Sequence, residues 1–332
     1  MNATTSLRIK IIAAFVAIYI IWGSTYLAIR FAIETIPPLL MAGGRFLIAG
    51  TLLFLWARFR GGAALPTFSD VKKSSLVGAL LLLGGNGMVV LAEQSVPSGL
   101  TALIIATEPL MIVTLEWMRR GGTRPVGKVA FGLLLGFAGV VFLIGPTNLS
   151  GSMNVDALGA TMLMVASLSW AIGSLYASKA HIQTAPLMTA SVQMLAGGAL
   201  LFIAGAATGE LGRLDISAIT TTSMLSVLYL IAFGSLVGFT CYSWMLKVVK
   251  PSLASTYAYV NPVVAVFLGW LIAGELFTGQ TIIAAIVILT GVVLILSDRK
   301  GNQQTQTTTR LVAEPDTVCE MEAVPISIEE KR

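Results

Sequence analysis

Two ionisable side chains stand deep inside long apolar stretches of this sequence, Arg45 and Glu108. A charged residue at membrane depth is costly unless it is paired or faces water, and such residues commonly mark a transport pathway. Pro109 follows Glu108 directly and should kink a helix there, because proline cannot donate to the preceding turn. A carboxyl beside such a kink could bind a solute or exchange a proton, since removal from water favours its neutral form. The alternative is an Arg45–Glu108 ion pair with a purely structural role.

A second group of candidates combines aromatic rings with hydroxyls near the middle of two apolar stretches. These residues are Trp22, Ser24, Thr25 and Tyr26, with Trp170, Ser174 and Tyr176 as their counterparts. Tryptophan and tyrosine normally gather at the membrane interfaces, so their presence at mid-depth is informative. Rings and hydroxyls together suit an amphipathic organic solute. Close helix packing through small residues is the competing explanation.

Polar residues in other apolar stretches extend this set: Asn86, Gln193, Tyr257 and Asn261. Together with the aromatic group and Arg45 they are the predicted substrate-binding residues, and Glu108 is the predicted proton-coupling residue. At the end of another stretch, Glu93 and Gln94 could line an outer vestibule or simply end a solvated helix.

The composition indicates the elements that must position these residues. Hydrophobic residues make up 56% of the chain and charged residues 11%, as expected of a polytopic membrane protein. A window of about 20 residues, the length that crosses the hydrocarbon core, predicts ten helical spans and an all-α fold. The spans cover roughly 11–31, 38–57, 75–94, 98–118, 126–145, 156–178, 186–207, 222–246, 252–273 and 277–297.

The two halves of the chain resemble each other in sequence. Residues 22–54 align without a gap onto residues 170–202, with matching Trp, Pro, Gly and Phe positions. A second stretch repeats at an offset of 153 residues, where Pro109 and Trp117 match Pro262 and Trp270. In this alignment Arg45 falls on Gln193 and Glu108 on Asn261, so the predicted site is asymmetric.

Basic residues predict the orientation of the spans. One side of the predicted membrane receives most of them: Arg8, Lys10, Arg58, Arg60, Lys72, Lys73, Arg119, Arg120, Arg124, Lys128, Lys179, Lys247, Lys250, Arg299 and Lys300. The other side receives only Arg30 and Arg213. By the positive-inside rule the basic side is cytoplasmic, and both termini lie there. Because each repeat holds five spans, an odd number, the second repeat must enter the membrane inverted, as in many transporters.

Several function classes lack their sequence signatures. The sequence contains no Walker loop, the motif that would indicate ATP hydrolysis. Its single histidine, His181, cannot form a histidine metal cluster and gives no sign of a catalytic triad. We therefore expect no enzyme, no cofactor, no metal and no nucleic-acid partner. The expected partners are a small-molecule substrate and the lipid bilayer. Gly132, Gly136 and Gly139 could support a homodimer or could pack inside the monomer.

The last segment, 298–332, differs in composition from the rest. It combines a polar low-complexity run, 303–309, with several glutamates, which predicts a disordered cytoplasmic tail. A dispensable extension and a regulatory or partner-binding segment are the two alternatives for its role.

Five sequence elements carry a resemblance to a known family: Ile21-Trp22-Gly23-Ser24-Thr25-Tyr26, Arg45, Thr107-Glu108-Pro109-Leu110, Asn261-Pro262 and Gly274-Glu275-Leu276-Phe277-Thr278. In these elements the chain resembles the EamA domains of the drug/metabolite transporter superfamily, and most of all its YedA-type metabolite exporters. Two such domains would cover 8–145 and 157–297. The resemblance implies ten helices in an inverted repeat and a central cavity lined by both halves, with the fifth and tenth spans peripheral. It also implies export across a bacterial inner membrane.

The sequence departs from the family pattern at one place. The Gly-Glu pattern of Gly274 and Glu275 is absent from the end of the first repeat, where 119–125 is basic instead. We therefore expect Glu275 to cap a helix and not to act in transport.

The predicted function is secondary active export of small amphipathic metabolites, such as amino acids, their derivatives or drugs, by alternating access. Proton antiport through Glu108 is the favoured mechanism. The alternatives are an uncoupled sugar or nucleoside transporter or importer, and a membrane receptor or scaffold that acts through its tail. An inverted duplication favours transport, because a receptor has no need for two alternating halves.

Overall fold

A computed structural model describes residues 3–119, 124–125, 127–144, 157–249, 251–254 and 256–294. Every regular element in these ranges is a helix, in agreement with the predicted all-α class. The predicted disordered tail, 298–332, lies outside the described residues.

The first half of the chain contains α1 to α7, with two π-helical stretches, η1 and η2, inserted. The bounds are α1 Ala3–Ala32, α2 Pro38–Leu55, η1 Trp56–Arg60, α3 Phe68–Gly78, η2 Ala79–Gly87, α4 Met88–Ala92, α5 Ser98–Ile105, α6 Glu108–Met118 and α7 Lys128–Ile144. The second half has the corresponding elements. They are α8 Ala157–Lys179, α9 Pro186–Ala207, α10 Glu210–Arg213, η3 Ile216–Ala218, α11 Thr221–Tyr229, η4 Leu230–Phe239, α12 Thr240–Val248, α13 Pro251–Ala254 and α14 Tyr257–Ala273. A final apolar helix covers Gly279–Leu294.

Within the described ranges, seven helices are long and apolar enough to cross a membrane. They are Leu7–Ala32, Pro38–Arg60, Phe68–Ala92, Ser98–Met118, Ala157–Lys179, Pro186–Ala207 and Thr221–Val248. Three shorter apolar helices, Lys128–Leu143, Val260–Ala273 and Gly279–Leu294, lie where the fifth, ninth and tenth spans were predicted. The structure thus supports seven of the predicted spans by length and composition, and the crossing of the other three stays a prediction.

The repeat-equivalent helices α2 and α9 pack closely and run antiparallel. A Cβ atom added at Gly43 would lie 2.7 Å from the backbone nitrogen of Phe202, and one at Gly50 would lie 3.0 Å from the backbone nitrogen of Leu195. The contacted residue of α9 moves from Phe202 back to Leu195 as the α2 residue moves from Gly43 to Gly50, so the two helices run in opposite directions. Antiparallel equivalents are what an inverted repeat requires.

The predicted kink at Pro109 is present as a break between two helices. Helix α5 ends at Ile105, and α6 starts at Glu108 with the proline in its first turn. A proline is tolerated at such a position because no intrahelical bond is expected from its nitrogen. The break places the Glu108 carboxyl at a helix start in the interior of the bundle.

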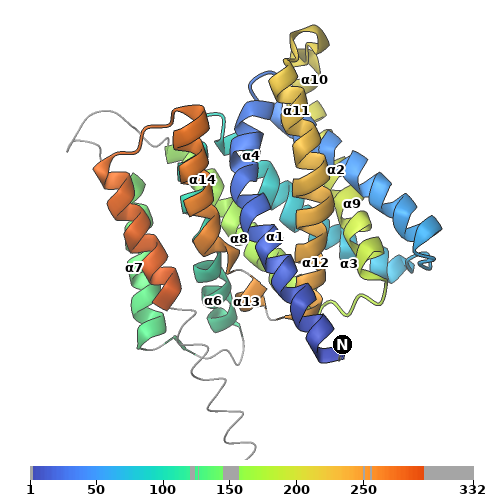
Figure 1. The fold of residues 1–332 in the computed structure, drawn as a ribbon, viewed down its shortest axis with the longest axis horizontal. Coiled ribbons are helices and arrows are strands. Elements are labelled where there is room, and N and C mark those ends of the chain that lie inside the picture. The colour runs from blue at the N-terminus through green and yellow to red at the C-terminus, as the bar shows by residue number, and fades with distance from the viewer. Residues whose placement is uncertain are drawn as a thin grey trace, which may run out of the picture.

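Figure 1 shows α1, α11, α12 and α14 side by side in front, with α7 at the edge of the bundle. The helix after α14 packs on α7, because a Cβ atom at Gly139 would lie 2.7 Å from Ile288 and one at Gly291 would lie 2.6 Å from the carbonyl oxygen of Gly132. A Cβ atom at Gly136 would approach Leu110 in the same way. In the described structure these glycines lie against helices of the same chain.

The two ends of the bundle are named here by residues. The Glu275 end carries α10 and the segment after α14, at the top of Figure 1, and the Lys247 end carries the N-terminal part of α1, at the bottom.

Candidate functional site

A central cavity of about 80 Å³ lies between helices of both halves. This volume is smaller than that of typical small-molecule sites, about 300–1,000 Å³, so the cavity must widen to take a solute of that size. Predicted site residues line it from six elements: Trp22, Thr25, Tyr26, Arg45, Asn86, Glu108, Trp170 and Tyr257. The structure therefore brings together the residues that the sequence marked on the first to fourth, sixth and ninth predicted spans.

Glu108 is almost fully buried in this cavity, with 1% of its surface exposed. The Tyr257 hydroxyl, on α14 of the second half, donates a hydrogen bond to Glu108 Oε2. The other oxygen, Oε1, is buried and has no hydrogen-bond partner in the described part of the chain. A carboxyl with one donor and one unbonded oxygen is poorly stabilised as an anion.

Arg45 reaches the same cavity from α2 and is 3% exposed. Its Nη2 atom donates to Asn86 Oδ1 at 2.6 Å, and its guanidinium carbon lies 4.4 Å from the ring centre of Phe46. Its Nε atom has no partner among the residues that the structure describes. The alternative of an Arg45–Glu108 ion pair is not found, because each group contacts a different neutral side chain. Arg45 thus keeps donors free for an anionic group, which guanidinium binds well.

Three aromatic residues line the cavity, Trp22, Trp170 and Tyr257, and they form a cluster with Tyr242 of α12, which lies behind them. The Trp22 ring lies 5.5 Å from Trp170, 5.1 Å from Tyr242 and 5.1 Å from Tyr257, measured between ring centres. The rings of Trp22 and Tyr257 meet edge to face at 87°, an arrangement that aromatic pairs prefer. Gly238 lets this cluster form, because a Cβ atom there would lie 2.4 Å from Trp22 Nε1.

Five predicted site residues do not line the cavity: Ser24, Ser174, Tyr176, Gln193 and Asn261. Two of their hydroxyls bond to tyrosines, Ser24 to Tyr229 at 2.6 Å and Ser174 to Tyr242 at 2.7 Å.

The other three are also held by the protein. Gln193 accepts a bond from Ser243, and Tyr176 packs on the hydrophobic core. Asn261 is buried with its amide beside the backbone carbonyls of Tyr19 and Tyr257. In the structure these polar groups hold helices together.

The remaining lining residues were not predicted. They are Ile29, Phe46, Leu82, Gly85, Val89, Ile105, Ala166, Ser167, Gly234 and Phe239. Most are ordinary apolar residues that carry no signal in so apolar a chain. Ser167 is the exception, since it lies three residues before Trp170 and thus on the same helix face. Its buried hydroxyl has no partner among the described residues, which suits a group that faces a solute.

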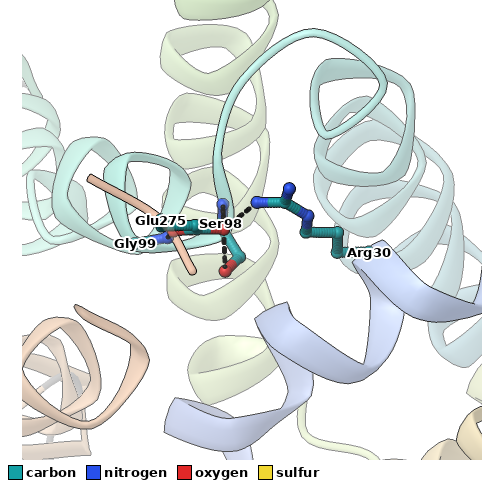
Figure 2. A network of polar contacts seen from close by, with 4 residues as sticks. All are labelled: Arg30, Ser98, Gly99 and Glu275. Carbon is teal, nitrogen blue, oxygen red and sulfur yellow. Dashed lines mark hydrogen bonds and ion pairs between the residues drawn. The ribbon is translucent and has the colours of Figure 1, made fainter. Parts of the chain in front are cut away.

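A polar network lies away from the cavity, at the Glu275 end (Figure 2). Glu275 Oε1 accepts from the backbone nitrogen of Ser98 at 2.9 Å and from its hydroxyl at 2.8 Å, and Oε2 accepts from the Gly99 nitrogen at 3.1 Å. Arg30 of α1 forms an ion pair with Oε1. Glu275 therefore caps a helix, as predicted, but the helix is α5 of the other half. The Arg30 contact was not predicted.

Two other carboxylates bridge the halves in the same way. At the Glu275 end, Glu210 accepts from the backbone nitrogens of Leu39 and Leu40 at the start of α2, at 3.3 and 2.9 Å. At the Lys247 end, Asp70 accepts from the Thr184 hydroxyl at 2.7 Å, just before α9. Helices α2 and α9 are repeat equivalents, so each half supplies a carboxylate near the start of the equivalent helix of the other half.

A second cavity lies at the Glu275 end and is called the vestibule here. It is lined by Arg30, Ile33, Glu34, Glu93, Gln94, Ser95, Val96 and Pro97. Glu93 and Gln94, for which a vestibule or a solvated helix end was expected, both line this cavity. No group of three or more His, Cys, Asp or Glu residues that could hold a metal ion occurs in the described ranges.

Comparison with known proteins identifies the family. The model of the EamA-like transporter family matches residues 9–145 and 157–297. The chain is 41% identical over 289 residues to the "Uncharacterized inner membrane transporter YedA" of Escherichia coli strain K12, covering 86% of this chain and 90% of that protein. It is 25% identical over 291 residues to a "Probable amino-acid metabolite efflux pump" of the same strain, covering 82% of this chain and 90% of the relative. A solved crystal structure matches with a TM-score of 0.60 at 20% identity, over 85% of this chain and 94% of the other, and supports the fold. The chain belongs to the EamA-like transporter family.

Proposed function

We propose that this protein exports small amphipathic organic solutes across a bacterial inner membrane, by alternating access and in exchange for protons. The observation that carries the proposal is the central cavity, where Arg45 and Glu108 are buried with unbonded polar atoms beside an aromatic wall. Buried groups that the protein leaves unsatisfied are expected where a ligand or a proton completes the bonding.

The cavity favours a solute with an anionic or strongly accepting group and an apolar body. Arg45 would bind the first through its free donors, and the rings of Trp22 and Tyr257 would pack against the second. Amino acids and their derivatives have this chemistry. The relative named as an amino-acid metabolite efflux pump supports this class.

Glu108 would couple solute movement to protons. With the cavity open to the outside, Glu108 takes up a proton and the solute leaves. With the cavity open to the cytoplasm, the proton leaves and solute binds again. Tyr257, from the opposite half, donates to Glu108 and so links the protonation state to the packing of the two halves. Such exchange between inverted halves is the general scheme of alternating access.

The topology of this proposal follows the charge distribution. All ten apolar helices would cross the membrane, the three shorter ones included. The Lys247 end and both termini would face the cytoplasm, and the Glu275 end would face outward. Because Glu275, Glu210 and Arg30 join the halves at that outer end, it must separate during release.

The test compares the growth medium of cells that produce the wild type, Glu108→Gln or no transporter, at equal membrane abundance. Untargeted mass spectrometry should find a class of amphipathic solutes enriched only with the wild type. Equal enrichment with Glu108→Gln would retain export and remove Glu108 from the mechanism. Loss of the solutes from the medium, with accumulation inside the cells, would indicate import instead.

A further inference from the structure

Glu93 is a second buried carboxyl that the protein leaves unsatisfied. It follows the last residue of α4, at the Glu275 end, and is 6% exposed. Both of its carboxylate oxygens are buried, and neither has a hydrogen-bond partner among the described residues. Helix capping therefore does not explain it, in contrast to Glu275.

In the part of the chain that the structure describes, the charged groups near Glu93 form no hydrogen bond or ion pair with it. Arg30, Arg45 and Glu275 all interact with it electrostatically, but Arg30 pairs with Glu275 and Arg45 donates to Asn86. Glu34 lies in the same vestibule and is exposed. An ionised carboxylate that is buried without hydrogen bonds costs several kcal/mol, and a proton on the carboxyl removes most of that cost. In this conformation Glu93 is therefore best described as protonated.

Glu93 is also linked to the central cavity through Tyr26. Its side chain lines the vestibule, whereas Tyr26, which interacts electrostatically with both Glu93 and Glu108, lines the central cavity. Tyr26 is thus close enough to interact with both carboxyls. These groups come from three different helical segments, and each can carry or relay a proton.

We infer that Glu93 is a proton-carrying residue that connects the vestibule to Glu108. The inference rests on the proposed role of Glu108 as the coupling carboxyl. Glu93 accepts a proton from the vestibule, and Tyr26 relays it toward Glu108 by accepting one proton and donating its own. Glu93 is then a residue of the proton path, and it does not bind the solute.

Infrared difference spectroscopy on the full chain in lipid bilayers tests this without any substrate. Raising the buffer pH should remove the carbonyl stretch of two protonated carboxyls in the wild type. One band should be missing in Glu93→Gln and the other in Glu108→Gln. Glu34→Gln is the matched control, since it removes an exposed carboxyl from the same vestibule and should leave both bands in place.

The rate gives the second readout, which a purely structural role would not change. After a rapid rise in pH, the Glu108 band should disappear at least about tenfold more slowly in Glu93→Gln than in the wild type. The reason is that the proton path has lost the carboxyl of Glu93 as its intermediate acceptor. Glu93→Asp keeps a carboxyl and should restore most of the rate.

Two outcomes would overturn the inference. If the spectrum of Glu93→Gln showed the same two bands as that of the wild type, Glu93 would hold no proton. An unchanged rate for the Glu108 band would place Glu93 off the path. If no titrating band belonged to Glu108, the proposed coupling role of Glu108 would be contradicted instead. The Glu93 band would still show whether Glu93 binds a proton.

Discussion

Glu275 and Glu108 are both buried carboxyls, but their surroundings are opposite. Glu275 receives hydrogen bonds from two backbone nitrogens and a hydroxyl and also pairs with Arg30. Glu108 receives one hydrogen bond, from Tyr257, and one of its oxygens is left without a partner in the described structure. The first arrangement binds every carboxylate oxygen to donors of the protein, whereas the second leaves one oxygen open to a proton or a solute. The difference separates a carboxylate that joins helices from one that can take part in transport.

The comparison predicts different consequences for substitutions at the two places. Changes at the central cavity should alter solute handling and leave stability nearly intact. Changes at the Glu275 network should lower stability and favour separation of the two halves at that end.

The largest effect is expected for Arg45→Ala. The substitution removes the free donors of the cavity, so export of solutes that carry a carboxylate should fall about 100-fold, as for loss of a charge-assisted contact of about 2.7 kcal/mol. Export of neutral solutes of the same shape should fall far less. Flux measured with such a matched pair of solutes checks this. An equal loss for both would show that Arg45 serves the fold and not recognition.

Glu275→Gln should act on stability. The amide cannot accept from all of the donors at the start of α5, and the Arg30 ion pair is lost, so we expect destabilisation of about 2 kcal/mol. Thermal unfolding in detergent measures this. Labelling of a cysteine introduced at Val96 in the vestibule should become faster, because the two halves separate more easily. A variant as stable and as closed as the wild type would remove the network from the gating of this end.

Tyr257→Phe tests the single hydrogen bond to Glu108. The hydroxyl donates to the carboxylate and so stabilises the ionised form, which means that Glu108 binds its proton more tightly without it. The pH profile of proton-driven flux should therefore move to higher pH, by about one unit for a lost bond of about 1.4 kcal/mol. Flux measured across a pH series gives the profile. A shift to lower pH would mean that the hydroxyl favours the neutral acid.

Ser98→Ala should have the smallest effect. It removes one of the donors to Glu275 and leaves both backbone donors in place, so the loss should be about 1 kcal/mol. In the Glu275→Gln background the same substitution should cost less, because the interaction is already broken. Unfolding temperatures of the two single variants and the double variant provide the cycle. Full additivity would mean that the two residues act independently.

The site positions that could be identified from the sequence are those whose residue type is unusual at their predicted depth in the membrane. Arg45, Glu108, Trp22 and Trp170 are costly or unusual at mid-membrane, and all four line the cavity. The antiparallel packing of α2 on α9 also follows the duplicated sequence pattern.

The contacts between helices were not predictable. Ser24 and Ser174 have the same residue type and setting as cavity residues, but tyrosines on distant helices occupy their hydroxyls. Glu275 was expected to cap a helix, but a single sequence does not show which helix start lies beside it. Such pairings depend on how the helices assemble, and the local sequence does not record that.

The most direct test of the account uses proteoliposomes and a solute that the wild type exports. Glu108→Gln should still exchange labelled for unlabelled solute, because exchange needs no net proton movement. It should fail to accumulate solute when a pH gradient is imposed, whereas the wild type and the Glu34→Gln control should accumulate it. Accumulation by Glu108→Gln equal to that of the wild type would contradict the central claim that Glu108 couples protons to export.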